Sequence, residues 1–377
     1  MVNKCLKKSC FRNDTALGSI SYSVMWNYFD WLPLSSPDYI SSLGEGHTPL
    51  LRSRRIGASL GLRNLFFKLE IQNPTGSYKD RFASMAASLM RQRNEGKMMA
   101  TSSGNTGSAL AAYAASFGFE LDLYVTENTP QEKLSQCLAY GASIYRLVGL
   151  GVNATLMQQA ISRLEEKARK QKAVLLISAV CLCPLEMQGV KTMAFEICDQ
   201  LNGAPDHVFI PVGGGGLFLS CASGFDEFYE HQKIRKHPCL HPVQPEGCAT
   251  VVGPLLEGGS SARLVDCTSA ISGLQVAALL DGQKVLEKTL LTNGRGHKVS
   301  DEDIYYWQSR LIRQEGIFAE PAAATSLAGL AQAVKNKQVD FEDVIVCLIT
   351  GSGFKDMKSI QELTKHAEVP LINPSEI

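Results

Sequence analysis

One lysine lies where a turn should pass into a helix. The stretch Asn73–Arg81, Asn-Pro-Thr-Gly-Ser-Tyr-Lys-Asp-Arg, follows the apolar run Leu65–Leu69, which is typical of a buried strand. Apolar residues then recur about every 3.6 positions, so we expect a helix from near Ser77, with Ser77 as its N-cap. Lys79 would lie in the first turn, in apolar surroundings. Desolvation and the positive end of the helix dipole lower the pKa of such a lysine, which favours the neutral amine that attacks an aldehyde. The alternative is a lysine that points into solvent, as most do.

A second stretch has the composition of an anion-binding turn. Thr101–Ser108, Thr-Ser-Ser-Gly-Asn-Thr-Gly-Ser, joins a predicted short strand to a predicted helix. Small residues let backbone N–H groups approach a ligand, and a helix N-terminus favours an anion such as a carboxylate. Asn105 adds a side chain that can donate to an aromatic oxygen. A tight turn that binds nothing remains the alternative.

Four consecutive glycines, Gly213, Gly214, Gly215 and Gly216, come directly after an apolar strand pattern. Such a run costs conformational entropy, and it is most easily explained by a backbone that wraps a phosphate. No Gly-Lys-Ser/Thr follows, and the Gly-x-Gly-x-x-Gly spacing with its acidic partner is absent, so neither a P-loop nor a dinucleotide site is predicted. The loop suggests a single phosphate.

A fourth stretch, Thr350–Asp356, ends a predicted strand with a hydroxyl residue and a glycine turn. In open α/β sheets, ligands are bound at such strand ends. An ordinary β-turn is the alternative.

The elements that must position these loops alternate between strand and helix patterns, which predicts an α/β fold with mainly parallel sheets. The number of units favours two open, mostly parallel sheet domains with a cleft between them. We expect residues 1–79 and 165–377 to form the larger domain, with an aromatic N-terminal arm, and residues 80–164 the smaller. Strands are predicted at Leu65–Leu69, Met98–Thr101, Leu121–Val125, Ser143–Val148, Val174–Ala179, His207–Val212 and Val344–Thr350. Helices are predicted at Asp80–Asn94, Gly107–Phe117, Gln131–Tyr140, Ala154–Lys172, Leu185–Asn202 and Ala322–Lys335.

Composition excludes several classes of function. Lys plus Arg equals Asp plus Glu at 37 each among 377 residues, so nothing global attracts nucleic acid or an anionic membrane. The first ten residues are too polar for a secretory signal, and no apolar run approaches the roughly 20 residues that cross a bilayer. The 11 cysteines suggest buried thiols in a reducing compartment and give no convincing zinc pattern. We therefore expect a cytoplasmic protein without a metal site.

In order and chemistry, the four stretches together resemble the pyridoxal-phosphate enzymes of fold type II (the tryptophan-synthase β-subunit fold), and the resemblance is closest to the threonine synthase family. Gly44–Leu50 and Glu315–Ala322 agree as well, so the resemblance covers roughly residues 40–360. It implies that the cofactor, pyridoxal 5′-phosphate, lies in the cleft between the domains. It also implies a small amino-acid substrate and a homodimer.

The resemblance also implies roles for the residues that would hold the cofactor. Lys79 would bond covalently to the cofactor aldehyde and later move protons at the substrate carbons. Asn105 would hydrogen-bond the 3′-oxygen, and Gly213–Gly216 would bind the phosphate. Thr350 would face the pyridine nitrogen, with Ser352 as a second candidate. A neutral hydroxyl there leaves the nitrogen mostly unprotonated, which suits elimination and replacement better than transamination.

On the substrate side, the resemblance implies that Ser103, Gly104 and Thr106 bind the α-carboxylate. Asn153 is a candidate for a substrate-phosphate contact or, equally, a surface cap. Lys191 is a candidate base in the segment Cys183–Thr192, which helps hold the substrate phosphate in threonine synthases.

That segment departs from the family at Glu186, an acid where the family has a base. A carboxylate there would repel a phosphate. Three enzyme functions therefore stay open: threonine synthesis from O-phosphohomoserine and water, β-replacement on an activated serine such as O-phosphoserine or O-acetylserine, and serine or threonine dehydration. A non-catalytic binding homologue is a fourth, which the retained Lys79, Asn105 and Thr350 argue against.

Overall fold

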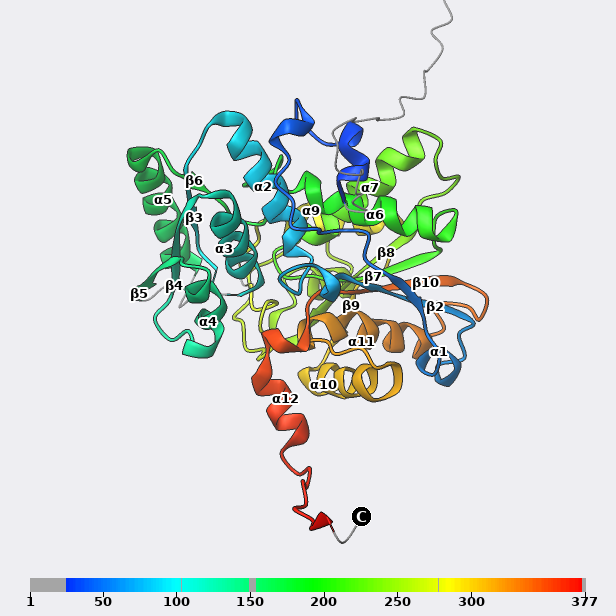
Figure 1. Ribbon diagram of the computed structural model, residues 1–377. Helices are drawn as coiled ribbons and strands as arrows, with labels where there is room; N and C mark the ends of the chain where they lie inside the picture. The colour runs from blue at the N-terminus through cyan, green and yellow to red at the C-terminus, as the bar shows by residue number, and fades with distance from the viewer. Residues whose placement is uncertain (1–24, 103, 149–153, 277, 375–377) are drawn as a thin grey trace, which may run out of the picture.

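Two parallel-rich sheets of different size make up the protein, in a computed structural model that describes residues 25–102, 104–148, 154–276 and 278–374 (Figure 1). The large sheet has the order β1-β2-β10-β7-β8-β9, and the small sheet has the order β5-β4-β3-β6. Among the paired strands in the described residues, β1–β2 is the one antiparallel pair. The predicted fold class, two open and mostly parallel sheets, is confirmed.

The large sheet is buried on both faces. Successive residues of β10, such as Val346 and Cys347, pack into different hydrophobic clusters, because alternate side chains of a strand point to opposite faces. In Figure 1, α6 and α7 cover one face while α10 and α11 cover the other. The strands of this sheet are β1 (Leu50–Arg52), β2 (Asn64–Leu69), β7 (His207–Pro211), β8 (Cys239–Pro245), β9 (His297–Val299) and β10 (Val344–Ile349). The helices of this part are α1 (Ile56–Ser59), α6 (Gln188–Leu201), α7 (Gly216–Glu230), α8 (Val252–Leu256), α9 (Gly282–Leu291), α10 (Asp301–Arg310), α11 (Pro321–Lys335) and α12 (Met357–Thr364).

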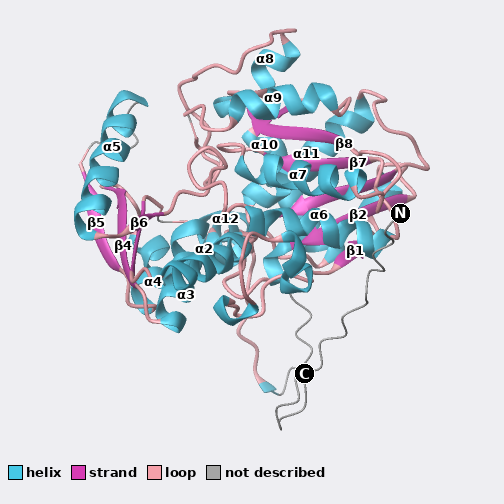
Figure 2. Cartoon of the chain, turned by 90° about the horizontal axis from the view of Figure 1, so that it is seen from above, coloured by secondary structure: helices cyan, strands magenta, loops and turns pink. Residues whose placement is uncertain are grey.

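The small sheet lies to one side of the larger body, with α5 on one face and α3 on the other (Figure 2). Its strands are β3 (Lys97–Ala100), β4 (Glu120–Thr126), β5 (Ser143–Leu147) and β6 (Val174–Leu175). Its helices are α3 (Asn105–Phe117), α4 (Gln131–Ala139) and α5 (Ala154–Gln171). The helix α2 (Lys79–Arg93) contacts both α3 and α6, so it joins the two parts.

Some local predictions need correction. The helix after the lysine turn begins at Lys79 with Tyr78 as its N-cap; Ser77 instead forms an isolated bridge with Gly351. The strand predicted at Val174–Ala179 pairs only over Val174–Leu175, because the chain then turns out of the sheet. The strands β1, β8 and β9 and the helices α1, α7, α8, α9, α10 and α12 were not predicted. The strand β8 contains two prolines, which are unusual in a central strand.

The domain boundary at residue 164 remains a prediction. Position 164 lies within α5, and β6 pairs with β3 of the small sheet. We propose that the smaller domain continues to the end of β6. Within the described residues, no helix is both long and apolar enough to cross a membrane.

Candidate active site

Lys79 faces a cavity of about 600 Å³ between the two sheets. Its Nζ donates a hydrogen bond to Ser178 Oγ at 2.6 Å and lies 4.5 Å from the centre of the Tyr78 ring. Burial lowers the pKa of Lys79 to about 7, although the nearby Glu320 carboxyl opposes this shift. A large share of this amine is therefore neutral at neutral pH, which is the form that attacks a carbonyl.

The N-terminus of α3 forms a second wall of the cavity. The helix begins at Asn105 with Gly104 as its N-cap, so its first N–H groups have no partner within the helix. Thr106 Oγ1 lies 3.1 Å from Ser178 Oγ, which links this wall to the Lys79 amine. A Cβ at Gly107 would lie 2.1 Å from the Ser102 carbonyl oxygen, so only glycine allows this tight turn.

The tetraglycine loop, Gly213–Gly216, forms a third wall at the N-terminus of α7. Gly215 has a φ of +101°, and a Cβ at Gly214 would lie 2.8 Å from Leu280 Cδ1. The N–H groups of Gly214, Gly215 and Gly216 donate to no other group in the described part of the chain. Free amides at the positive end of a helix suit an anion such as phosphate.

Thr350, at the carboxyl end of β10, lines the cavity as predicted. Its carbonyl accepts from Tyr78 N at 3.0 Å, which fixes the lysine turn to the strand. Ser352 does not line the cavity: its N–H donates to Gly76 O at 2.9 Å and its Oγ accepts from Phe354 N. The second candidate for the pyridine nitrogen is thus not placed for that role.

Glu320 and Ser178 are among the lining residues for which no role was predicted. Glu320 Oε1 accepts from Asn105 Nδ2 at 2.9 Å, and burial raises the pKa of this carboxyl to about 7. The only sequence signal for Glu320 was its place in the family-like stretch Glu315–Ala322. Ser178 lies in the predicted strand Val174–Ala179, and nothing in the sequence indicated a functional role for it.

Of the other substrate-side candidates, the structure describes only Lys191. Ser103 and Asn153 lie outside the described residues. Lys191 is buried on α6, where its Nζ donates to Glu227 Oε1 at 2.7 Å, and it does not line the cavity. Glu186 lies 3.4 Å from Arg93 Nη1 and is also absent from the lining, so the expected repulsion of a bound phosphate is not supported.

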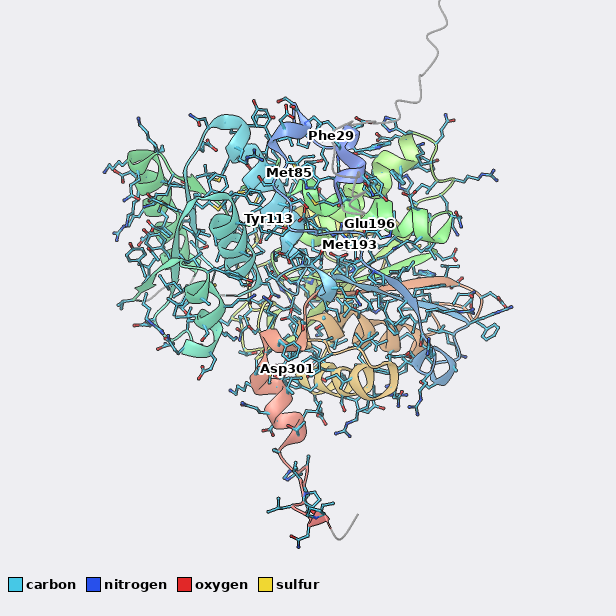
Figure 3. The ribbon with its side chains drawn as sticks, in the orientation of Figure 1. Phe29, Met85, Tyr113, Met193, Glu196 and Asp301 are labelled. Atoms are coloured by element: carbon cyan, nitrogen blue, oxygen red, sulfur yellow. The ribbon has the colours of Figure 1, made fainter. Side chains whose placement is uncertain are left out.

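A buried ion cluster holds the helix that carries Lys79. Arg81 on α2 donates to Glu70 Oε1 at 2.7 Å and to Glu196 Oε1 at 2.6 Å, and Glu196 also accepts from Lys68 at 2.6 Å. Figure 3 labels Glu196 on α6, close to where α2 and α6 meet. The surrounding charges keep the Arg81 pKa well above its usual value despite burial. The cluster therefore fixes the start of α2 relative to β2 and α6.

A buried amine of low pKa, a glycine-lined helix N-terminus and a hydroxyl at a strand end meet in a cleft between two parallel sheets. This fold and site define a fold type II pyridoxal-phosphate enzyme. Residues 41–351 match the family described as "Pyridoxal-phosphate dependent enzyme", and the chain belongs to that family.

Several curated relatives are named threonine synthase. The one from Methanocaldococcus jannaschii is 33% identical over 335 residues, covering 88% of this chain and 80% of the relative. The one from a Bacillus species is also 33% identical, covering 88% of this chain and 90% of the relative. Among solved structures, the processed form of threonine deaminase isoform 2 from Solanum lycopersicum superposes with a TM-score of 0.69 at 22% identity, over 85% of this chain and 83% of that one.

The cofactor of the family is pyridoxal 5′-phosphate, as predicted, and the residues present fit it. Lys79 offers an amine of low pKa, and the Gly214–Gly216 amides offer unpartnered donors for the phosphate. In the described part of the chain, the hydroxyl of Thr350 makes no side-chain hydrogen bond, which leaves it available to a ligand in the cavity. Asn105 donates one amide N–H to Glu320, which leaves the second N–H available to a ligand in the cavity.

Proposed function

We propose that the protein is a threonine synthase, which converts O-phosphohomoserine and water to threonine and phosphate. The observation that carries the proposal is the 33% identity to threonine synthases over 88% of the chain. That similarity extends over most of the chain, in which the lysine turn, the tetraglycine loop and the Thr350 strand end meet at one cavity.

In this proposal each wall of the cavity has a separate task. The tetraglycine loop and the N-terminus of α7 hold the cofactor phosphate, Asn105 meets the 3′-oxygen and Thr350 faces the ring nitrogen. Gly104 and Thr106, together with Ser103, bind the substrate α-carboxylate at the N-terminus of α3. When bound, the cofactor withdraws electrons from the substrate carbons.

Lys79 takes protons from the substrate carbons and returns them. A group with a pKa of about 7 can both accept and donate a proton near neutral pH, and such groups are effective general acid–base catalysts. The 2.6 Å hydrogen bond to Ser178 Oγ holds the Lys79 amine in position. A neutral Thr350 opposite the ring nitrogen favours elimination of the substrate phosphate over transamination.

A second candidate is β-replacement on an activated serine, or dehydration of serine or threonine. The observation that favours it is the departure at Glu186, where threonine synthases have a base. That departure weighs less because Glu186 lies outside the cavity, beside Arg93.

The test is phosphate release by the cofactor-loaded protein from O-phosphohomoserine, set against O-phosphoserine. We expect release with threonine formed from the first compound only. We also expect the Lys79→Ala variant to lose both this activity and the visible absorbance of the bound cofactor. Release from O-phosphoserine alone, or a keto acid formed from threonine, would favour the second candidate.

We further propose a cytoplasmic homodimer. The family resemblance supports the dimer, and free cysteines at nine described positions fit a reducing compartment. Light scattering of the purified protein measures the assembly directly, and a mass near 41.0 kDa would contradict the dimer.

A further inference from the structure

Two lysines with no assigned role line the cavity beside the site. The titratable groups of the lining are Tyr78, Lys79, Glu132, Lys133, Glu320 and Lys355. Neither Lys133 nor Lys355 forms an ion pair with a carboxylate in the described ranges. By contrast, the buried Lys68 and Lys191 each have a carboxylate within 2.7 Å. The Glu320 carboxyl interacts electrostatically with both lysines, and the Asp80 carboxyl with Lys355, but neither contacts them directly. Each ammonium can therefore still bind an anion from solution.

Lys133 extends from the small domain towards the large one. It lies on α4, and its Nζ donates to Ser272 Oγ at 2.7 Å. Ser272 precedes Gly273, whose carbonyl oxygen lies 3.0 Å from the place of a Cβ at Gly213. The Lys133 ammonium therefore contacts the Ser272–Gly273 segment, which packs against the tetraglycine loop.

Lys355 extends in the opposite direction, from the end of β10 to the small domain. Its Nζ donates to Ser108 Oγ at 2.9 Å and to Gln136 Oε1 at 2.7 Å. Gln136 and Lys133 are three positions apart on α4 and so share one face of that helix. The Lys355 ammonium thus contacts the face of α4 that carries Lys133.

We propose that Lys133 and Lys355 together bind the phosphate group of the substrate, a subsite that rests on the proposed function. The tetraglycine loop is assigned to the cofactor phosphate and the N-terminus of α3 to the substrate α-carboxylate. The two lysines therefore remain for the second anionic group of the substrate. An ammonium has three N–H donors; Lys133 uses one and Lys355 uses two, which leaves three for phosphate oxygens. Lys191 and Glu186, from the segment expected to do this, lie outside the cavity.

Burial lowers the pKa of Lys355, and the Asp80 and Glu320 carboxyls oppose this shift. The acids of the lining do not cancel the positive charge of the two lysines. Glu132 is exposed to solvent, where its charge is screened. Glu320 accepts from Asn105, and its pKa of about 7 leaves it partly protonated at neutral pH. A substrate with a negatively charged distal group is therefore favoured over homoserine, serine or threonine.

The test uses the cofactor-loaded variants Lys133→Met and Lys355→Met, with Lys133→Arg and Lys355→Arg to keep the charge. Lys335→Met, an exposed lysine at the end of α11, is the matched control. Calorimetry gives the Kd of a non-hydrolysable phosphonate analogue of O-phosphohomoserine. The visible spectrum gives the Kd of norvaline, which has an uncharged side chain, and reports how much cofactor is retained.

Each Met variant should bind the phosphonate roughly 10- to 100-fold more weakly, the range for a lost charge-assisted hydrogen bond. Norvaline affinity and cofactor retention should be unchanged, and the Arg variants should recover part of the phosphonate affinity. Unchanged phosphonate affinity in both Met variants, an equal loss for norvaline, or loss of the cofactor would each overturn the subsite.

The two proposals fail in different ways. Suppose that the wild-type protein releases no phosphate from O-phosphohomoserine, but that Lys133→Met and Lys355→Met bind the phosphonate more weakly than the wild type and the Arg variants do. The proposed function then fails and the subsite stands. If the wild-type protein makes threonine and the Met variants match it in phosphonate affinity, only the subsite fails.

Discussion

Neutralising Glu196 measures how strongly the helix of Lys79 is held. Glu196 accepts from Arg81 and Lys68, each at 2.6 Å, and also from the backbone N–H of His47 at 2.8 Å. The side chains of both cations are fully buried. Glu196→Gln removes a buried charge and directs an amide donor towards groups that also donate.

The expected loss follows from these contacts. Removing one partner of a buried ion pair costs about 3–5 kcal/mol, because the remaining charge stays buried without compensation. Arg81 keeps Glu70, and Lys68 keeps the Thr48 carbonyl and the Gln200 side chain as acceptors. The lower end of that range, about 3 kcal/mol of unfolding free energy, is therefore expected.

Equilibrium urea unfolding, followed by far-UV circular dichroism, compares this variant with Glu342→Gln. Glu342 pairs with Arg63 at 3.1 Å, but their side chains are 64% and 59% exposed, so its loss should cost less than about 1 kcal/mol. Equal losses of unfolding free energy in the two variants would refute the reasoning that burial increases the contribution of the Arg81 cluster to stability.

The contribution of Glu196 to stability also depends on pH. The neighbouring cations hold the pKa of Glu196 below its ordinary value of 4.5, so its stabilisation is present above that pH and is lost as the pH falls below it. The difference between wild-type and Glu196→Gln protein should thus shrink as the pH falls below 4.5. A difference that grows towards acid pH would contradict the sign.

Two further changes test the loop and the core. Gly215→Ala should weaken cofactor binding, because φ is +101° and the new Cβ would lie 2.8 Å from Val285 Cγ2. Titration of the cofactor, followed by visible absorbance, measures this. The control Gly96→Ala, where a Cβ meets nothing within 4 Å, should bind the cofactor normally. Burial lowers the pKa of His297 from 6.5 to about 4, so its neutral form stabilises the fold above pH 6.5 and this contribution is lost as the pH falls towards 4. The urea midpoint of His297→Gln should therefore change less between those pH values than the wild-type midpoint does. The midpoint of His366→Gln, a variant at an exposed position, should change with pH as the wild-type midpoint does.

The sequence alone determined the features that depend on neighbouring residues. Strand and helix periods are local patterns, and they predicted the α/β fold. The lysine turn, the glycine run and two further motifs carry a family resemblance, which implied the cofactor and the residues Lys79, Asn105 and Thr350 that line one cavity. Helix and strand types were correct where the apolar period was long. No strand was predicted at β1, β8 or β9, and no helix at α1, α7, α8, α9, α10 or α12. The strand β6 was predicted too long, because only two of its residues pair.

Only the tertiary structure decided which polar side chains share that cavity. Asn105 and Glu320 are 215 positions apart, and Lys133 meets Ser272 across 139, so no spacing in the sequence predicts either contact. Lys191 has the right residue type in a family-like segment, but the rotation of α6 directs it to Glu227. A side chain's direction around a helix is set by how that helix packs, and packing is a property of the whole fold rather than of the segment.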